Sequence, residues 1–199
     1  MFRRQRKAFT LIELMISFTI ISILTCIAIP SLIRAKINAN ETSAVASIKA
    51  IQEAEEVFFK NDWYKIGTYS YANFLDDLCV LPNDQPALIT SSLATARAMG
   101  NWYDAPTEPN QGYLFNEISQ YGTQPVTVTL PSGQVISQTY GVIAAPAGYL
   151  VTGQFMFAGD NNSQIWMMDP LGDFDLTQHK PLTLYNLSDM SANGWQPYQ

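Results

Sequence analysis

The chain has 199 residues, of which 47% are hydrophobic and 14% are charged, and its formal net charge is −6. This length fits one globular domain with an additional element, and the composition is that of a folded rather than a disordered protein. Four of its cations, Arg3, Arg4, Arg6 and Lys7, precede residue 8, so the rest of the chain is more acidic still. An acidic chain lacks the basic face that nucleic-acid binding requires, and no nucleic-acid partner is predicted for it alone.

The most informative stretch is the apolar run Phe9–Ile29, which contains a single charged residue, Glu13. About 21 helical residues at roughly 1.5 Å each span a bilayer core of about 30 Å. The basic residues before the run place the N-terminus in the cytoplasm, because positive charge stays on that side. A carboxylate inside such a run costs about 3 kcal/mol unless it is paired. Glu13 is therefore predicted to have a specific partner.

The sequence of residues 8–14, AFTLIEL, resembles the processing site of type IV prepilins and of the pseudopilins of type II secretion. The resemblance implies cleavage between Ala8 and Phe9 by a prepilin peptidase of the inner membrane, followed by N-methylation of the new terminus. The family strongly prefers glycine before the cut, where this chain has Ala8. The resemblance covers Met1 to about Asp62 well and the remaining residues only loosely.

Glu13 follows Phe9 by four residues, which is about one helical turn. Cleavage would expose a positively charged amine at Phe9. The resemblance implies that the acid at this position meets the amine of a neighbouring subunit in a growing filament. The amine of the same chain is also within reach, and the sequence leaves both partners open.

Pro30 ends the apolar run, at a place where the family commonly has a proline. It is predicted to kink or locally melt the helix and to push Ile29 away from helical angles. Beyond it an apolar stripe resumes at Ile33, Ile37, Ala44, Ile48, Ile51 and Phe58, while Glu41, Lys49, Gln52, Glu53 and Glu56 occupy other faces. This pattern predicts a helix from Phe9 to about Phe59, roughly 75 Å long. The expected segments are a basic leader (1–8), a transmembrane or filament-core helix (9–30), its amphipathic continuation (31–60) and a globular head (61–199).

In the head, Asn73–Leu78 resembles the short helix that follows the long helix in many pseudopilin-like proteins, and a second short helix is predicted at Ser91–Met99, ending at Gly100. One hairpin is expected from Val126–Leu130 and Gln134–Tyr140, and a second from Tyr149–Phe157 and Gln164–Met168. About four antiparallel strands laid on the long helix make an α+β fold. This is the lollipop architecture of type IV pilins that the resemblance also implies.

Catalytic motifs are absent from the sequence. It has one histidine, no G-x-S-x-G nucleophile motif and no Walker or dinucleotide fingerprint, so the prediction is that the chain is not an enzyme and holds no cofactor. Calcium is a secondary alternative, because Asp160, Asp169, Asp173 and Asp175 supply hard oxygen ligands and major pseudopilins carry a calcium site in their C-terminal loops. Their spacing matches no EF-hand loop, and turns recruit aspartate for backbone reasons anyway.

These observations predict a structural subunit of a type IV pilus-like filament. It is held in the bacterial inner membrane, cut by prepilin peptidase and polymerised by an assembly platform through its N-terminal helix into an extracellular filament. A pseudopilin of a periplasmic type II secretion filament is the alternative within the family, and Glu13 argues against its tip-initiating class. A secreted binding domain or hydrolase, cleaved near Ala28 from an ordinary signal peptide, and an uncut membrane-anchored sensor are the alternatives from other classes.

Overall fold

The computed structural model describes residues 9–64, 67–81, 85–96, 108–117, 120–121, 124–125, 127–170 and 194–198, so the predicted leader lies outside the described residues. The chain divides into two compact units, Met1–Lys36 and Ile37–Gln199. The helix α1 (Leu11–Lys60) contributes to both units, and its bounds confirm the predicted long helix. Cys26 and Cys79 are free cysteines.

Pro30 lies inside α1, and Ile29 is helical as well. The prediction that the helix melts locally at Pro30 is therefore wrong. The physical reason is that a proline removes a single N–H, the one that would bond to the carbonyl of Cys26. The helical hydrogen bonds on both sides of this one missing bond keep the chain in register.

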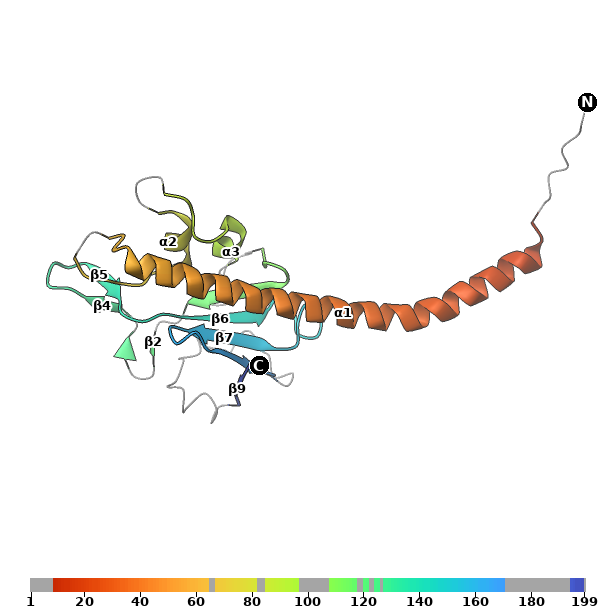
Figure 1. Ribbon diagram of the computed structural model, residues 1–199. Coiled ribbons are helices and arrows are strands. Elements are labelled where there is room, and N and C mark those ends of the chain that lie inside the picture. The colour runs from red at the N-terminus through yellow and green to blue at the C-terminus, as the bar shows by residue number, and fades with distance from the viewer. Residues whose placement is uncertain are drawn as a thin grey trace, which may run out of the picture. The chain divides into compact units, whose positions relative to one another are not determined.

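The second unit combines the Ile37–Lys60 part of α1 with two short helices, α2 (Leu75–Cys79) and α3 (Ser91–Thr95), and an antiparallel sheet. Five strands lie in the order β1 (Tyr113–Glu117), β6 (Gly141–Pro146), β7 (Met156–Asp160), β8 (Ile165–Met168) and β9 (Gln196–Pro197). Two small ribbons pair β2 (Gln120–Tyr121) with β3 (Gln124–Pro125) and β4 (Thr127–Thr129) with β5 (Val135–Ser137). This part of α1 lies across the five-stranded sheet (Figure 1), which confirms the predicted α+β, pilin-like fold.

Both predicted hairpins form, with different bounds. β4 pairs with β5 outside the five-stranded sheet, and β7 pairs with β8 inside it. The predicted strand Tyr149–Phe157 begins too early, because Tyr149–Gly153 forms a turn in which Leu150 has a φ of 57°. Of the predicted helix Ser91–Met99, the structure shows Ser91–Thr95 as helical, and residues 97–107 lie outside the described part.

β6, a central strand of the sheet, was not predicted. All six of its residues are buried, and alternate side chains enter two different clusters. Val142 and Ala144 pack with α1, whereas Ile143 and Ala145 pack with Trp195 on the other face. A strand that is buried on both faces reads as a continuous apolar run, so it shows no alternation that would mark it in the sequence.

The predicted apolar stripe of α1 is buried at Ala44, Ile48, Ile51 and Phe58, whereas Ile33 is exposed. The helix approaches β7 closely at Gly159, where a Cβ atom would lie 2.5 Å from Cγ2 of Ile48. Such proximity excludes any larger residue unless the helix shifts. The absence of a side chain on β7 at this point therefore sets the distance between helix and sheet.

Polar side chains of α1 also bond to the backbone of the head. Nδ2 of Asn40 donates to the carbonyl of Thr152 at 2.7 Å, and Nε2 of Gln52 donates to the carbonyl of Asp160 at 3.1 Å. Gln52 is 6% exposed, so the prediction that it lies away from the buried face of the helix is wrong. These bonds join α1 to two backbone carbonyl groups of the head, and the Asp160 carbonyl also accepts the N–H of Ser163 at 3.3 Å.

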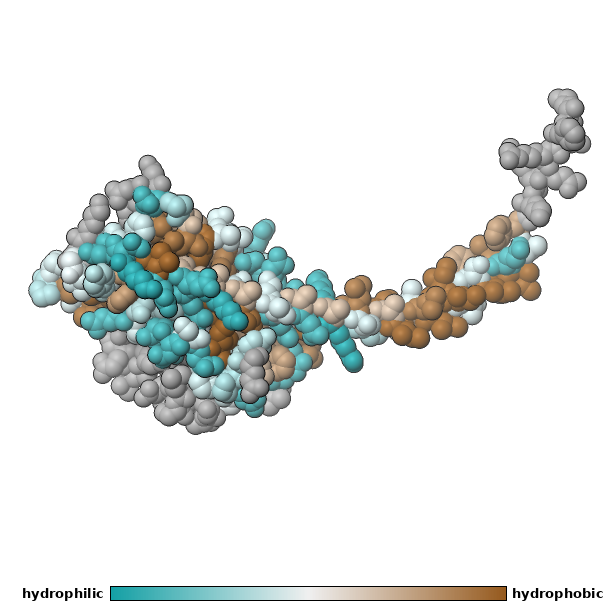
Figure 2. Space-filling view, viewed as in Figure 1, coloured by the Kyte–Doolittle hydropathy of each residue, from teal (hydrophilic) through white to brown (hydrophobic). Residues whose placement is uncertain are grey.

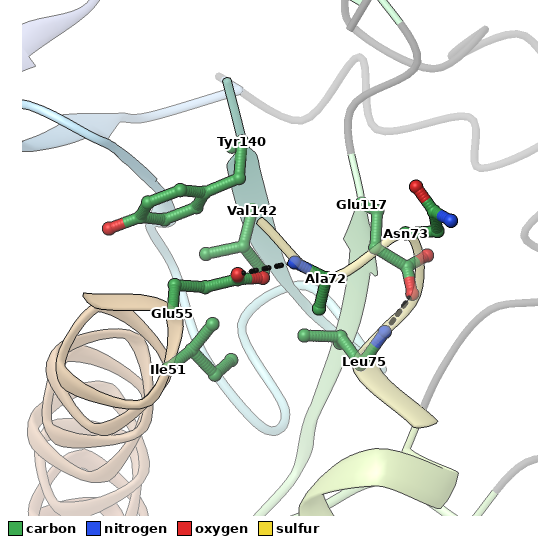
Figure 3. A pocket seen from close by; sticks show the side chains of 9 residues that line it. Ile51, Glu55, Ala72, Asn73, Leu75, Glu117, Tyr140 and Val142 are labelled. Carbon is green, nitrogen blue, oxygen red and sulfur yellow. Dashed lines mark hydrogen bonds between the residues drawn. The ribbon is translucent and has the colours of Figure 1, made fainter. Parts of the chain in front are cut away.

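Glu55 is the deeply buried acid of this interface and is 4% exposed. Its Oε2 accepts a hydrogen bond of 2.9 Å from the backbone N–H of Ala72, beside a cavity of about 20 Å³ that Glu117 also lines (Figure 3). Burial, and to a lesser degree the charges of Asp77 and Glu117, raise the pKa of Glu55 to about 8, against the opposing effect of the Ala72 N–H. At neutral pH the folded chain therefore holds Glu55 mainly in its protonated form.

Because the folded chain binds this proton more tightly than the unfolded chain does, its stability falls as pH rises from about 4.5 to about 8. In wild type the free energy of unfolding should fall by on the order of a few kcal/mol across this pH range. We expect Glu55→Gln to abolish this fall, since glutamine stays neutral and still accepts the hydrogen bond from the Ala72 N–H. Denaturant unfolding of the full-length chain in detergent at pH 5 and pH 8 measures this difference. Glu53→Gln, at an exposed position of the same helix, is the control, and equal pH dependence of wild type and Glu55→Gln would contradict the assignment.

Candidate functional site

The first turn of α1 is closed by three hydrogen bonds between Thr10 and Glu13. Oε2 of Glu13 accepts hydrogen bonds from the backbone N–H of Thr10 at 2.9 Å and from its hydroxyl at 2.8 Å. Oγ1 of Thr10 in turn accepts the backbone N–H of Glu13 at 3.3 Å. This arrangement is a capping box, which satisfies N–H groups that a helix start otherwise leaves without partners. It explains why the helix begins at Leu11.

Sequence reasoning missed the role of Thr10, although a threonine three residues before a glutamate and ahead of an apolar run is the known signal for such a cap. Phe9 precedes the helix and is 80% exposed. Phe9 and Glu13 are thus near one another in sequence, but Phe9 is not on a helical face. Within the described residues, Oε1 of Glu13 accepts no hydrogen bond, so the cap fixes the carboxylate and leaves one oxygen available.

Phe9 and the first part of α1 together expose a continuous apolar surface. Its large apolar side chains are between 49% and 80% exposed, and Figure 2 shows the hydrophobic colour running along this stretch. They are Phe9, Leu11, Ile12, Leu14, Met15, Ile16, Phe18, Ile20, Ile21, Ile23, Leu24, Ile27, Ile29, Leu32 and Ile33. By length and composition the helix is able to cross a membrane. An exposed apolar surface of this extent marks a membrane or protein contact.

Comparison with known proteins agrees with this geometry. Residues 3–29 match the family model described as the prokaryotic N-terminal methylation motif. The type IV wide pilus major component PilA4 of Thermus thermophilus is 35% identical over 96 residues, which cover 48% of this chain and 69% of that protein. The chain belongs to the type IV pilin family.

The type IV major pilin protein PilA of Myxococcus xanthus is also similar, with 41% identity over 58 residues. That match covers 29% of this pilin and 26% of the Myxococcus protein, so most of the latter has no counterpart in the comparison. No solved structure matches the chain significantly. Membership in a family of structural subunits makes this pilin a structural protein rather than an enzyme.

The hydroxyl side chains of the apolar stretch are satisfied within the helix. Ser17, Thr19, Ser22 and Thr25 each donate to the carbonyl four residues earlier, at 2.8 to 2.9 Å. These bonds remove the cost of placing a hydroxyl in an apolar environment. Glu13 is therefore the polar side chain of this stretch that still has a free oxygen among the described residues.

The two calcium candidates that the structure describes, Asp160 and Asp169, bond to different partners. Asp160 accepts hydrogen bonds from the backbone and side chain of Asn162, which closes the turn between β7 and β8. Asp169 accepts the hydroxyl of Tyr149 at 3.0 Å and Nε2 of Gln154 at 2.6 Å. Among the described residues no three His, Cys, Asp or Glu side chains are close enough to hold a metal ion. Asp173, Asp175 and Ala8 lie outside the described residues.

The capping box predicts a measurable role for Thr10. Thr10→Val keeps the size of the side chain and removes its hydroxyl. We therefore expect the free energy that stabilises the first helical turn to fall by about 1 kcal/mol. Backbone amide exchange at Glu13, measured by NMR on the full-length chain in detergent micelles, should accelerate about fivefold. Thr19→Val removes a hydroxyl further along the same helix and serves as the control. An unchanged exchange rate at Glu13 would show that the cap does not hold the helix start.

Proposed function

We propose that this pilin is a structural subunit of a type IV pilus-like extracellular filament, processed between Ala8 and Phe9 and polymerised through α1. The observation that carries the proposal is the exposed apolar surface of Phe9–Ile33, which has one capped carboxylate at its start. A lipid bilayer covers this surface before assembly, and the same surface of other copies covers it in the filament core. The match to the N-terminal methylation motif supports the processing step.

Before assembly the subunit is held in the inner membrane with its N-terminus in the cytoplasm. Arg3, Arg4, Arg6 and Lys7 favour this orientation. Prepilin peptidase then removes residues 1–8 together with these four positive charges. The product begins with the amine of Phe9, which is methylated and lies next to an apolar helix.

In the filament, Glu13 pairs with the Phe9 amine of a neighbouring subunit. An amine and a carboxylate are each costly in apolar surroundings, and each removes the cost of the other when they meet. The capping box supports this role because Thr10 occupies Oε2 of Glu13 and leaves Oε1 for the incoming amine. The cap also orients the carboxylate before the partner arrives, which reduces the entropy lost on pairing.

An extracellular pilus is favoured over a periplasmic secretion pseudopilus by the similar proteins. The Thermus relative is a wide pilus major component and the Myxococcus relative a major pilin. In this proposal an assembly platform in the inner membrane extracts the subunit from the bilayer and adds it to the filament, as the resemblance of residues 8–14 to prepilins implies.

The processing site is tested by the intact mass and N-terminal sequence of the protein recovered from cells. We expect a chain that begins at Phe9, with one methyl group on its amine. A chain that begins near Ser31 would identify a secreted domain released from a signal peptide. An uncut Met1 would identify a membrane anchor, and either result would overturn the proposal.

The Glu13 pairing is tested with Glu13→Gln and Glu13→Ala. Glutamine keeps an oxygen for the Thr10 cap and loses the charge, so it separates pairing from capping. We expect both variants to be processed and inserted but to yield at least about tenfold fewer filaments, because the Phe9 amine loses its counterion. Ser17→Ala on the same helix is the control, and filaments are counted by electron microscopy. A normal filament yield from Glu13→Gln would contradict the pairing.

A further inference from the structure

The segment Ala72–Leu75 leads into α2, and all four of its backbone N–H groups donate to carboxyl groups. The first N–H donates to Oε2 of Glu55 on α1 at 2.9 Å, and the last donates to Oε1 of Glu117 on β1 at 2.7 Å (Figure 3). The two between them donate to Oδ2 of Asp77 on α2 at 3.1 and 3.0 Å. Acids of three elements thus meet at one short segment, which we call the junction segment.

The other bonds of the junction segment join neutral groups. Oγ of Ser137 donates to Oδ1 of Asn73 at 2.8 Å, and Nδ2 of Asn73 donates to the carbonyl of Val135 at 3.2 Å. Directly before the segment, the N–H of Tyr71 donates to the carbonyl of Ser137 at 2.9 Å. Amide, hydroxyl and carbonyl groups of these kinds do not titrate near neutral pH, so they tie the segment to β5 in the same way across that range.

Glu55 differs from the other two acids in its burial. It is 4% exposed, whereas Asp77 and Glu117 are half-buried. These two acids face Glu55 from α2 and β1, and their charges disfavour a third negative charge beside them. Burial is the larger cause of the raised pKa of Glu55, which is about 8. Glu55 is thus the acid of the junction that changes charge near neutral pH.

Three tyrosine hydroxyls also lie close enough to Glu55 to interact with its charge, namely those of Tyr64, Tyr71 and Tyr140. Burial raises the pKa of each of them, so they stay neutral where Glu55 titrates. Among the residues that the structure describes, no ammonium or guanidinium group forms an ion pair with Glu55. The charge that Glu55 acquires on losing its proton is therefore not offset by a cation of this part of the chain.

The junction offers an ionised Glu55 little water. The cavity beside it measures about 20 Å³, which is room for about one water molecule and too little to hydrate a carboxylate. The carboxylate is hydrated fully only when the junction segment moves away from α1. Such a movement breaks the Ala72 bond and displaces α2, because α2 begins at Leu75, the last residue of the segment.

We propose that Glu55 is a proton-controlled latch, which holds the junction segment and α2 against α1 while it is protonated and releases them when its proton passes to water. The opening is local. The hydrogen bonds of Asn40 and Gln52 to the head do not involve the junction segment, so α1 and the sheet stay together. The inference goes beyond the proposed function and does not depend on it, because every group of the latch lies in the head.

The test is amide hydrogen exchange of the full-length chain in detergent micelles, followed by NMR at pH 6 and pH 8. Each observed rate is divided into the intrinsic rate at the same pH, which gives a protection factor for opening alone. We expect the protection factor of the Ala72 amide to fall at least about tenfold from pH 6 to pH 8, because the opened segment no longer favours the proton. In Glu55→Gln it should change by less than about twofold, since glutamine accepts the same bond and stays neutral.

Two controls accompany this measurement. Glu53→Gln removes an exposed acid of the same helix and should keep the wild-type fall. The amides of Phe157 and Ala158 lie in β7, between β6 and β8, and report on unfolding of the whole head. We expect them to stay more protected than the Ala72 amide at both pH values, because the local opening leaves the sheet intact.

Three results would overturn the latch. The first is equal protection of the Ala72 amide at pH 6 and pH 8 in wild type, and the second is a fall in Glu55→Gln as large as in wild type. The third is protection of the Ala72 amide equal to that of β7, which would mean that the segment opens only when the whole head unfolds. If Glu55→Gln does not fold, the first and third results still decide from wild type alone.

Discussion

The packing of Ile37–Lys60 against the sheet is the interaction on which the rest of the head depends. Its apolar part joins Ile48, Ile51 and Phe58 to the side chains of β1, β6 and β7. Gly159 lets the helix come close, and Asn40 and Gln52 donate hydrogen bonds to backbone carbonyl groups of the head at this interface. One side of this part of the helix is buried against the head. The other side is exposed.

Three carboxylates of α1, those of Glu13, Glu41 and Glu55, form no ion pair among the described residues. Each is stabilised by different means. Glu13 takes part in a cap at the helix start. Glu41 accepts backbone N–H groups of Gln154 and Phe155, which join the helix to the segment before β7. Glu55 accepts one N–H and keeps its proton. A cap, a backbone contact and protonation are alternatives to an ion pair, and they suit an acidic head with few cations.

The chemistry of the helix surface changes along its length, and the proposed functions follow that change. The first part is apolar with internally bonded hydroxyls, so it suits both lipid and a bundle of identical helices. The exposed side of the second part carries charged residues such as Lys49, Glu53 and Lys60 and suits water. One helix is thereby proposed to serve membrane storage and filament assembly without a separate domain for each.

The long helix, its apolar start and the lone carboxylate Glu13 within that start follow from the sequence alone, because composition and local periodicity determine them. Local signals also located the two hairpins, and the family resemblance indicated α2. The sequence did not reveal that β6 is a central strand, since burial on both faces removes the alternation that marks a strand. Nor did it reveal that Gln52 and Glu55 are buried or that the helix does not melt at Pro30. These features depend on contacts between distant segments and on the cooperativity of a long helix, which only the tertiary structure decides.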